Sequence, residues 1–354
     1  MNKKNAMKHI LLFALLLCTM FIFSCNKRAD SAKHSTPNAS NYFNLEEEGI
    51  KTGGVKMIPI TTSVGTFKVW TKRFGNNPRI KILILHGGPA LTHEYLESFE
   101  SFFPGEGFEF YEYDQLGSYY SDQPKDSVLW TLDRFTDEVE QVRKALGLTK
   151  DNFFLLGQSW GGILAMEYAL KYQHNLKGLI ISNMMASYPK YGAYNEKLRQ
   201  ELRKSLVDSL VAFEQKGDFH NPVYQQLVTT EFYCKHICRM PETQWPEPIQ
   251  RSFKHINQPV YELIQGPSEF VPGGLLKNWD REKDLKNITV PTLMIGAHFD
   301  SMDPEYMKLM STLVPNGEYL YCPDGSHLCM WDDQQHYFPG VINFINKVDH
   351  SKKQ

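Results

Sequence analysis

The sequence is poor in cysteine and has little excess charge of either sign. Its 354 residues include six cysteines, too few and too irregularly spaced for a disulfide scaffold. A formal net charge of -2 excludes a global basic field for nucleic acid, so we expect no nucleic-acid partner. Cys234 and Cys238 flank His236, but no fourth ligand follows at zinc-finger spacing. We therefore interpret these cysteines as packing residues and predict no metal and no cofactor.

Long apolar runs are also scarce, and the one at the N-terminus is too short to span a bilayer comfortably. It extends over residues 10–23 and follows three lysines, as in the h-region of a signal peptide. It ends at Ile22-Phe23-Ser24-Cys25, which resembles the lipobox of bacterial lipoproteins, where the cysteine carries the lipid. We predict a lipoprotein-type signal peptide over residues 1–25 and an exported protein held on a cell-envelope membrane through lipid on Cys25. An ordinary secretory signal and an uncleaved anchor are the alternatives.

The folded part begins near residue 43, after a polar stretch over residues 26–42 that is typical of a flexible tether. From there apolar strand-like runs alternate with amphipathic helical segments. The runs that predict strands are residues 55–60, 67–74, 80–85, 108–113, 153–156 and 179–182, and the helical segments are residues 132–146 and 161–172. Near-continuous apolar runs are typical of parallel strands buried on both faces. The alternation predicts a mostly parallel, doubly wound sheet.

The alternation stops over residues 186–286, which are rich in helix formers, aromatics and charges and are interrupted by prolines. We interpret this segment as an inserted helical cap. Residues 289–297 and 317–322 restore two buried strands, each followed by a helix, near Pro304 and Trp331. The predicted core thus comprises residues 43–185 and 287–354.

Ser159 lies between a predicted strand and a predicted helix, in the run Gly157-Gln158-Ser159-Trp160-Gly161-Gly162. A Gly-x-Ser-x-Gly run in that context forms a nucleophile elbow, a turn so tight that neighbours with side chains would clash. Ser159 is therefore the predicted nucleophile, and the predicted fold class is α/β, an α/β-hydrolase fold with an inserted helical cap. The alternative is a serine that only caps a helix.

A serine nucleophile needs a histidine base oriented by a carboxylate, and in this fold the chain order is serine, acid, histidine. His327 follows the last buried strand, where the fold returns a histidine to the elbow. Asp300 and Asp303 both follow the preceding strand, but Asp303 stands directly before Pro304, as a helix N-cap does. We predict Ser159, Asp300 and His327 as the catalytic triad.

The oxyanion of a serine hydrolase needs two preorganised N–H donors. The first is predicted at Trp160, directly after the nucleophile. The second is predicted in the loop His86-Gly87-Gly88-Pro89, at Gly88, where the missing Cβ lets the backbone face the substrate carbonyl.

Further motifs extend from about residue 58 to residue 345. They comprise His86-Gly87-Gly88-Pro89, Tyr113-Asp114-Gln115-Leu116-Gly117-Ser118, Gly157-Gln158-Ser159-Trp160-Gly161-Gly162, Gly266-Pro267-Ser268-Glu269-Phe270 and Gly325-Ser326-His327-Leu328. Together they resemble the proline iminopeptidase (prolyl aminopeptidase) family of serine peptidases. The resemblance implies release of an N-terminal residue, often proline, from short peptides with a free N-terminus, through an acyl-enzyme.

The resemblance also implies that carboxylates in the cap bind the α-amino group of the substrate, because a buried ammonium is costly unless paired. Glu269 matches a family motif and is the first candidate, and Glu231 is the second; either could instead be a solvated helix charge. The sequence departs from the family at Ala90 and at Tyr119-Tyr120, where glycine is common. We expect the two tyrosines to narrow or reshape the substrate pocket.

Fold and triad alone do not determine the substrate. A small ester, lactone or amide hydrolase on the same scaffold therefore stays open beside the aminopeptidase, as does a non-catalytic surface-binding protein. An epoxide hydrolase or dehalogenase is disfavoured because those chemistries place aspartate where Ser159 stands. The sequence predicts no oligomeric state.

Overall fold

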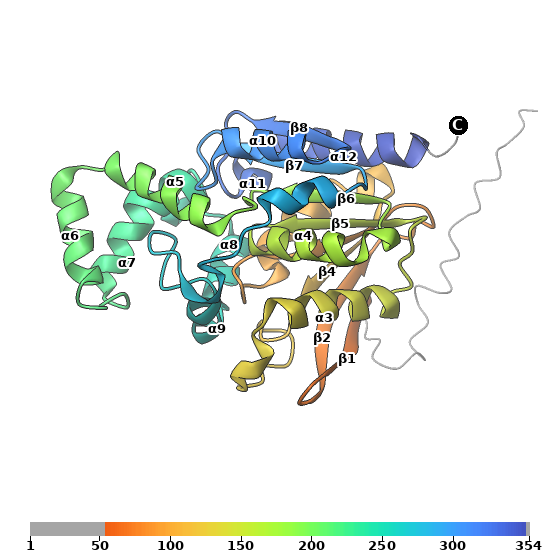
Figure 1. Ribbon diagram of the computed structural model, residues 1–354, viewed down its shortest axis with the longest axis horizontal. Coiled ribbons are helices and arrows are strands. Elements are labelled where there is room, and N and C mark those ends of the chain that lie inside the picture. Colours follow the sequence, from red (N-terminus) through yellow and green to blue (C-terminus); the bar gives the residue numbers. More distant parts are fainter. Residues whose placement is uncertain (1–53, 352–354) are drawn as a thin grey trace, which may run out of the picture. The chain divides into compact units, whose positions relative to one another are not determined.

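The computed structural model describes residues 54–351, which are built around an eight-stranded sheet (Figure 1). Its strand order is β1-β2-β4-β3-β5-β6-β7-β8. The strands are β1 (Val55–Thr62), β2 (Gly65–Phe74), β3 (Lys81–Leu85), β4 (Glu109–Asp114), β5 (Phe153–Gln158), β6 (Gly178–Ser182), β7 (Thr292–Ala297) and β8 (Gly317–Cys322). β2 pairs antiparallel with β1 and β4, and all the other neighbouring strands are parallel.

Helices cover both faces of the central part of the sheet, which explains the near-continuous apolar runs of β3, β5, β6 and β7. Leu83 and Leu155 lie in the core beneath α3, α4 and α10, whereas Ile82 and Phe154 face the opposite core, beneath η2 and α12. Successive residues of a strand point to opposite faces, so a strand covered on both sides must be apolar throughout. These covering helices are η2 (His93–Ser101), α3 (Leu132–Ala145), α4 (Trp160–Tyr172), α10 (Pro304–Leu313) and α12 (Gln334–Ser351).

The α/β fold class is confirmed, and most predicted elements occur within a few residues of their expected bounds. β8 has the predicted bounds, but the expectation that it is buried is wrong, because it is an edge strand in which Cys322 alone is buried. α10 begins at Pro304, and the Asp303 side chain accepts a hydrogen bond from the Glu305 N–H. The helix expected near Trp331 is α11 (Cys329–Asp332), followed by α12. The 3-10 helix η2 was not predicted, and it is the element that brings Tyr95 to the site.

A helical segment connects β6 to β7 where the cap was predicted. It comprises α5 (Tyr188–Gln200), α6 (Lys204–Glu214), α7 (Pro222–Val228), the π-helix η6 (Thr229–Ile237), α8 (Glu247–Lys254) and α9 (Gln258–Ile264). Figure 1 shows α5, α6 and α7 to the left of the sheet, away from α3 and α4. Short 3-10 turns complete the described chain at Pro104–Glu106, Ser127–Leu129, Gln173–Asn175, Glu242–Gln244, Gly274–Leu276 and Glu282–Asn287. The division of the chain at residues 186 and 286 stays a prediction.

The predictions for the N-terminal region fall on residues that the structure does not describe. They comprise the signal peptide over residues 1–25, the tether over residues 26–42 and the lipid-bearing Cys25. Within residues 54–351 no helix combines the length and the apolar character needed to cross a membrane. The cysteines of that range, Cys234, Cys238, Cys322 and Cys329, are free thiols.

The aromatic cluster around Phe103 gives a test of the core beneath η2. Phe103 is fully buried, with ring centroids 5.0 Å from Phe99 and 5.5 Å from both Phe108 and Phe110. Because the surrounding rings cannot fill the space left behind, Phe103→Ala should lower the free energy of unfolding by about 3–5 kcal/mol. Urea denaturation measures this. The control is Leu309→Ala, at a residue that is 44% exposed, which should change the free energy of unfolding by less than about 0.5 kcal/mol. Equal losses of stability in the two variants would contradict the assignment of Phe103 to the buried core.

Candidate active site

The nucleophile elbow depends on a very close crossing of β5 and α4. A Cβ at Gly157 would lie 2.1 Å from the Gly161 carbonyl oxygen, and a Cβ at Gly161 would lie 2.2 Å from the Leu85 carbonyl oxygen. Glycine is therefore required at both positions. Between them Ser159 adopts φ 54° and ψ -127°, a strained conformation for a residue with a side chain. This turn places Ser159 at the carboxyl end of β5, where it lines a cavity.

His327 and Asp300 come together as the sequence predicts. His327 Nδ1 lies 2.8 Å from Asp300 Oδ1, and the Asp300 carboxylate is fully buried. Asn183 Nδ2 donates to the other carboxylate oxygen at 2.7 Å, and the Met302 N–H donates to Oδ1 at 3.0 Å. These donors hold the acid in place so that it can orient the imidazole. Asn183, with φ 55°, was missed from the sequence because it follows β6, far along the chain from the acid it contacts.

The charge environment of His327 suits a general base. Burial opposes protonation, but the charge of Asp300 and its hydrogen bond outweigh burial and raise the pKa of His327 above its ordinary value; the Glu269 carboxylate adds to the rise. His327 and Ser159 line the same cavity. No hydrogen bond joins Ser159 Oγ to His327 in the described part of the chain, and such bonds are often long until substrate binds.

The loop that carries His327 is hydrogen-bonded to the end of the π-helix η6. The His327 N–H donates to the His236 carbonyl oxygen at 3.0 Å, and the Leu328 N–H and Ser326 Oγ donate to the Ile237 carbonyl oxygen at 2.8 and 2.9 Å. The Ser326 N–H donates to Asp332 Oδ1 at 3.0 Å. The position of the base therefore depends on a cap element.

Neither predicted oxyanion donor, Trp160 or Gly88, donates its backbone N–H to a backbone acceptor outside the helices and strands of residues 54–351. Trp160 is the first residue of α4, so its N–H has no acceptor within the helix. In the loop after β3 the Gly87 N–H is used, because it donates to the Tyr95 hydroxyl at 2.6 Å. Gly88 lines the cavity with φ 107°, a conformation that favours glycine. The structure thus favours Gly88 over Gly87, and the oxyanion assignment stays a prediction.

His86 orders this loop. Its Nε2 accepts from the Gln115 N–H at 3.1 Å, so the proton sits on Nδ1, which donates to the Gly87 carbonyl oxygen at 2.8 Å. Burial lowers the pKa of His86, so the ring is neutral at neutral pH. Gln115 Oε1 also accepts from Trp160 Nε1 at 2.8 Å. These contacts make His86 a structural link between the oxyanion loop and the elbow.

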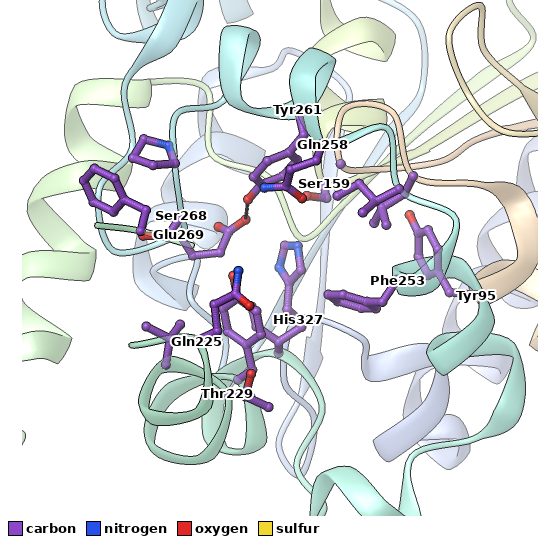
Figure 2. A pocket seen from close by; sticks show the side chains of 18 of the residues that line it. Tyr95, Ser159, Gln225, Thr229, Phe253, Gln258, Tyr261, Ser268, Glu269 and His327 are labelled. Carbon is purple, nitrogen blue, oxygen red and sulfur yellow. Dashed lines mark hydrogen bonds between the residues drawn. The ribbon is translucent and has the colours of Figure 1, made fainter. Parts of the chain in front are cut away.

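The cavity has a volume of about 320 Å³ and is lined mainly by aromatic and aliphatic side chains. Figure 2 shows His327, Glu269 and Tyr261 around the same space. Its apolar walls include Leu91, Phe219, Val228, Ile237, Phe253, Ile256 and Leu328. Among the described residues that line it, Glu269 is the one carboxylate. The site therefore combines a nucleophile, a base and one fixed negative charge in an apolar chamber.

The two predicted cap glutamates have different surroundings. The hydroxyl groups of Tyr191 and Tyr261 donate to Glu269, the latter at 3.0 Å, as Figure 2 shows for Tyr261. Glu231 does not line the cavity; its carboxylate accepts from Lys235 Nζ at 2.9 Å, and this bond lowers its pKa. The structure brings Glu269 to the nucleophile and pairs Glu231 with a lysine on the same helix.

The expectation that Tyr119 and Tyr120 narrow the pocket is wrong, because neither lines the cavity. The Tyr119 ring stacks on His255 of the segment after α8, with centroids 3.9 Å apart, and the Tyr120 hydroxyl donates to Glu94 Oε1 at 2.7 Å. Both tyrosines lie where the cap meets η2. The other departure has a local consequence, because Ala90 adopts φ 58°, in the region that favours glycine.

A search for metal ligands among the described residues finds one group, Asp324, Asp333 and His336, whose ligand atoms lie within 4.8 Å of one another. Asp333 Oδ1 already lies 2.6 Å from His336 Nδ1. None of the three lines the cavity, so the triad chemistry does not involve them.

Comparisons with known proteins agree with this geometry. The model of the α/β hydrolase fold family matches residues 81–334. The chain is 61% identical to the proline iminopeptidase of Flavobacterium johnsoniae over 84% of this chain and 99% of that protein, and 52% identical to that of Chitinophaga pinensis over 83% and 99%. The chain belongs to the proline iminopeptidase family. Its fold also matches the crystal structure of the proline iminopeptidase of Mycobacterium smegmatis, with a TM-score of 0.75 and 27% identity over 84% of this chain and 100% of that chain. It is a serine hydrolase on the α/β-hydrolase scaffold.

The raised pKa of His327 predicts the pH dependence of this serine hydrolase. The base acts in its neutral form, so the acid limb of kcat/KM should have its midpoint above 6.5, the ordinary value for histidine. In Asp300→Asn the limb should move to lower pH, because the charge that favours the imidazolium is gone, and kcat should fall by roughly 10⁴-fold. Asp303→Asn keeps a helix-capping side chain and should leave both the midpoint of the acid limb and kcat unchanged. A pH profile of the three proteins is the measurement, and an unshifted limb in Asp300→Asn would contradict the pairing.

Proposed function

We propose that this enzyme releases an N-terminal proline, or another apolar residue, from short peptides with a free N-terminus, through an acyl-enzyme. The observation that supports this proposal most directly is the environment of Glu269. Its hydrogen-bond donors are neutral hydroxyl and amide groups, and it has no cationic partner among the described residues. It faces the cavity that Ser159 and His327 line. The relatives described above as proline iminopeptidases support the same activity.

Other carboxylates of the cap contrast with Glu269. Glu214 pairs with Arg199 at 2.7 Å, and Glu231 pairs with Lys235 at 2.9 Å. A carboxylate in an apolar chamber gains most from a cation, because burial strengthens the interaction and makes an unpaired charge costly. A protonated N-terminal amine supplies that cation, and the nitrogen of an internal peptide bond does not. Glu269 would thus select chain ends and reject internal bonds.

The geometry supports the following steps. His327 takes the proton of Ser159 Oγ as the oxygen attacks the carbonyl of the first residue, and the oxyanion forms between the N–H groups of Trp160 and Gly88. His327 then gives the proton to the departing amine, which leaves an ester on Ser159. Water, deprotonated by the same imidazole, hydrolyses the ester and frees the amino acid. Asp300 holds the imidazole throughout and stabilises its charged form.

The test compares L-prolyl and L-alanyl 2-naphthylamides with their N-acetylated forms. Hydrolysis of the free amines alone supports the proposal, because acetylation removes the charge that Glu269 would bind. Equal rates on both forms, or activity confined to esters, would defeat it. A fluorophosphonate probe that fails to label Ser159 in folded protein would favour a non-catalytic binding protein instead.

Substitution of Glu269 tests the role of its charge. Glu269→Gln keeps the shape but loses the charge, so kcat/KM on prolyl naphthylamide should fall by at least about 30-fold, the effect of removing one partner of a buried charge pair. Fluorophosphonate labelling of Ser159 needs no amine and should not fall. Glu231→Gln is the matched control and should leave both rates within about twofold, since that glutamate does not line the cavity. A similar loss in both variants would contradict the assignment.

We propose as well that the protein is exported and anchored to a membrane of the cell envelope by lipid on Cys25. The support is the lysine-rich start, the apolar run and the lipobox-like Ile22-Phe23-Ser24-Cys25. Radiolabelled palmitate should enter the full-length protein in bacteria and should not enter Cys25→Ala. Label in both proteins, or in neither, would refute the anchor.

A further inference from the structure

The hydroxyl of Tyr95 lies where three parts of the site meet: the oxyanion loop, the elbow and the loop of the base. The Gly87 N–H donates to the Tyr95 hydroxyl at 2.6 Å, and this hydroxyl donates to Gln158 Oε1 at 2.6 Å. Gln158 Nε2 donates in turn to the His327 carbonyl oxygen at 3.0 Å. We propose that Tyr95 and Gln158 are positioning residues that hold the oxyanion donors in register with Ser159.

The direction of these hydrogen bonds follows from the chemistry of the groups. A backbone N–H can only donate, so the Tyr95 oxygen accepts from Gly87 and directs its own proton to Gln158. The Gln158 amide then presents its oxygen to the tyrosine and its nitrogen to the His327 carbonyl oxygen. Each group has one complementary partner, so the chain of bonds has a single consistent arrangement.

The loop is packed directly on the nucleophile at this point. A Cβ at Gly87 would lie 2.9 Å from Ser159 Cβ and 3.0 Å from both the Tyr95 hydroxyl and Gln158 Oε1. A shift of the loop therefore changes the distance between the Gly88 N–H and the reacting carbonyl. Displacements of about 1 Å can cost about 100-fold in rate, so a hydrogen bond that fixes the loop acts on the chemical step.

Both side chains are buried, Tyr95 at 1% exposure and Gln158 at 1%. Removing the hydroxyl would leave the Gly87 N–H and the Gln158 carbonyl oxygen without their present partner. A buried polar group without a partner is costly, which favours a shift of the loop that gives the Gly87 N–H another acceptor. For Gly87 such a movement would pull the oxyanion loop away from the elbow.

The backbone that carries Tyr95 is held independently of the hydroxyl, and the ring is packed in the core beneath η2. Trp331 Nε1 donates to the Tyr95 carbonyl oxygen at 2.7 Å. Two residues further along η2, Glu97 pairs with Arg251 of the cap helix α8. Tyr95→Phe should therefore keep the ring in place and remove only the two hydrogen bonds of the hydroxyl.

The test compares Tyr95→Phe with Tyr168→Phe. Tyr168 is the matched control, because it is also buried and its hydroxyl also donates to one acceptor, Glu140 Oε2 at 2.7 Å, in a place remote from the cavity lining. Three quantities are measured: kcat and KM on prolyl naphthylamide, inhibition by pyrrolidine-2-boronic acid, and inhibition by L-prolinol. The boronate forms a tetrahedral adduct with Ser159 that uses the oxyanion donors, whereas prolinol has the amine and no carbonyl group.

For Tyr95→Phe we expect kcat to fall about 10- to 100-fold with KM within about twofold, as for the loss of part of an oxyanion site. Inhibition by the boronate should weaken by the same factor, and inhibition by prolinol should stay unchanged. Gln158→Leu, which breaks the chain of bonds at its other end, should give the same pattern. An unchanged kcat in Tyr95→Phe, or equal weakening of boronate and prolinol, would overturn the proposal.

The choice of prolyl compounds rests on the proposed function, so one further measurement separates the two. The rate of Ser159 labelling by a fluorophosphonate requires the oxyanion donors and no amine. Slower labelling in Tyr95→Phe than in Tyr168→Phe supports the positioning role even if the wild type does not hydrolyse prolyl substrates. Equal labelling rates would overturn it.

Discussion

The closeness of β5 and α4 at the elbow sets the position of every other group in the site. A Cβ on Gly157 would lie 2.1 Å from the Gly161 carbonyl oxygen, and a Cβ on Gly161 would lie 2.2 Å from the Leu85 carbonyl oxygen, so neither atom could be accommodated. The backbone can reverse direction there only by forcing Ser159 to φ 54°. That conformation lifts the hydroxyl out of the strand and starts α4 at Trp160, so that nucleophile and first oxyanion donor are products of one turn. The second donor, the base and the acid must then be brought to this fixed point by other segments.

The parts of the structure that follow from local constraints could be predicted from the sequence. Strands covered on both faces are apolar throughout, and a turn that excludes Cβ atoms needs glycines, so β3 and the elbow were located well. Groups that depend on contacts between distant segments left no local pattern. Tyr95 meets Gln158 across 63 residues, and Asn183 meets Asp300 across 117. The narrowing expected from Tyr119 and Tyr120 was wrong for the same reason, since these side chains contact His255 and Glu94 from distant parts of the chain.

The cap is bound to the catalytic groups and does not only cover them. The end of η6 accepts hydrogen bonds from the loop of His327, and the Asn257 N–H donates to the Ala90 carbonyl oxygen at 3.0 Å, two residues after Gly88. On η2, Arg251 joins Glu97. The base, the oxyanion loop and the helix η2 that carries Tyr95 are thus all in contact with cap elements. A movement that opened the cap would disturb the positions of the catalytic groups, so the shape of the cavity and the catalytic geometry are coupled.

The charges of the site link substrate binding to the state of the base. Asp300 and Glu269 both raise the pKa of His327, but only Asp300 is needed to orient the ring. Before substrate binds, the charge of Glu269 therefore favours the imidazolium, which cannot accept the proton of Ser159. A substrate ammonium at Glu269 would offset much of that charge and so lower the pKa of His327. The same contact that identifies the N-terminus would then increase the fraction of neutral base, and a ligand without the amine would not.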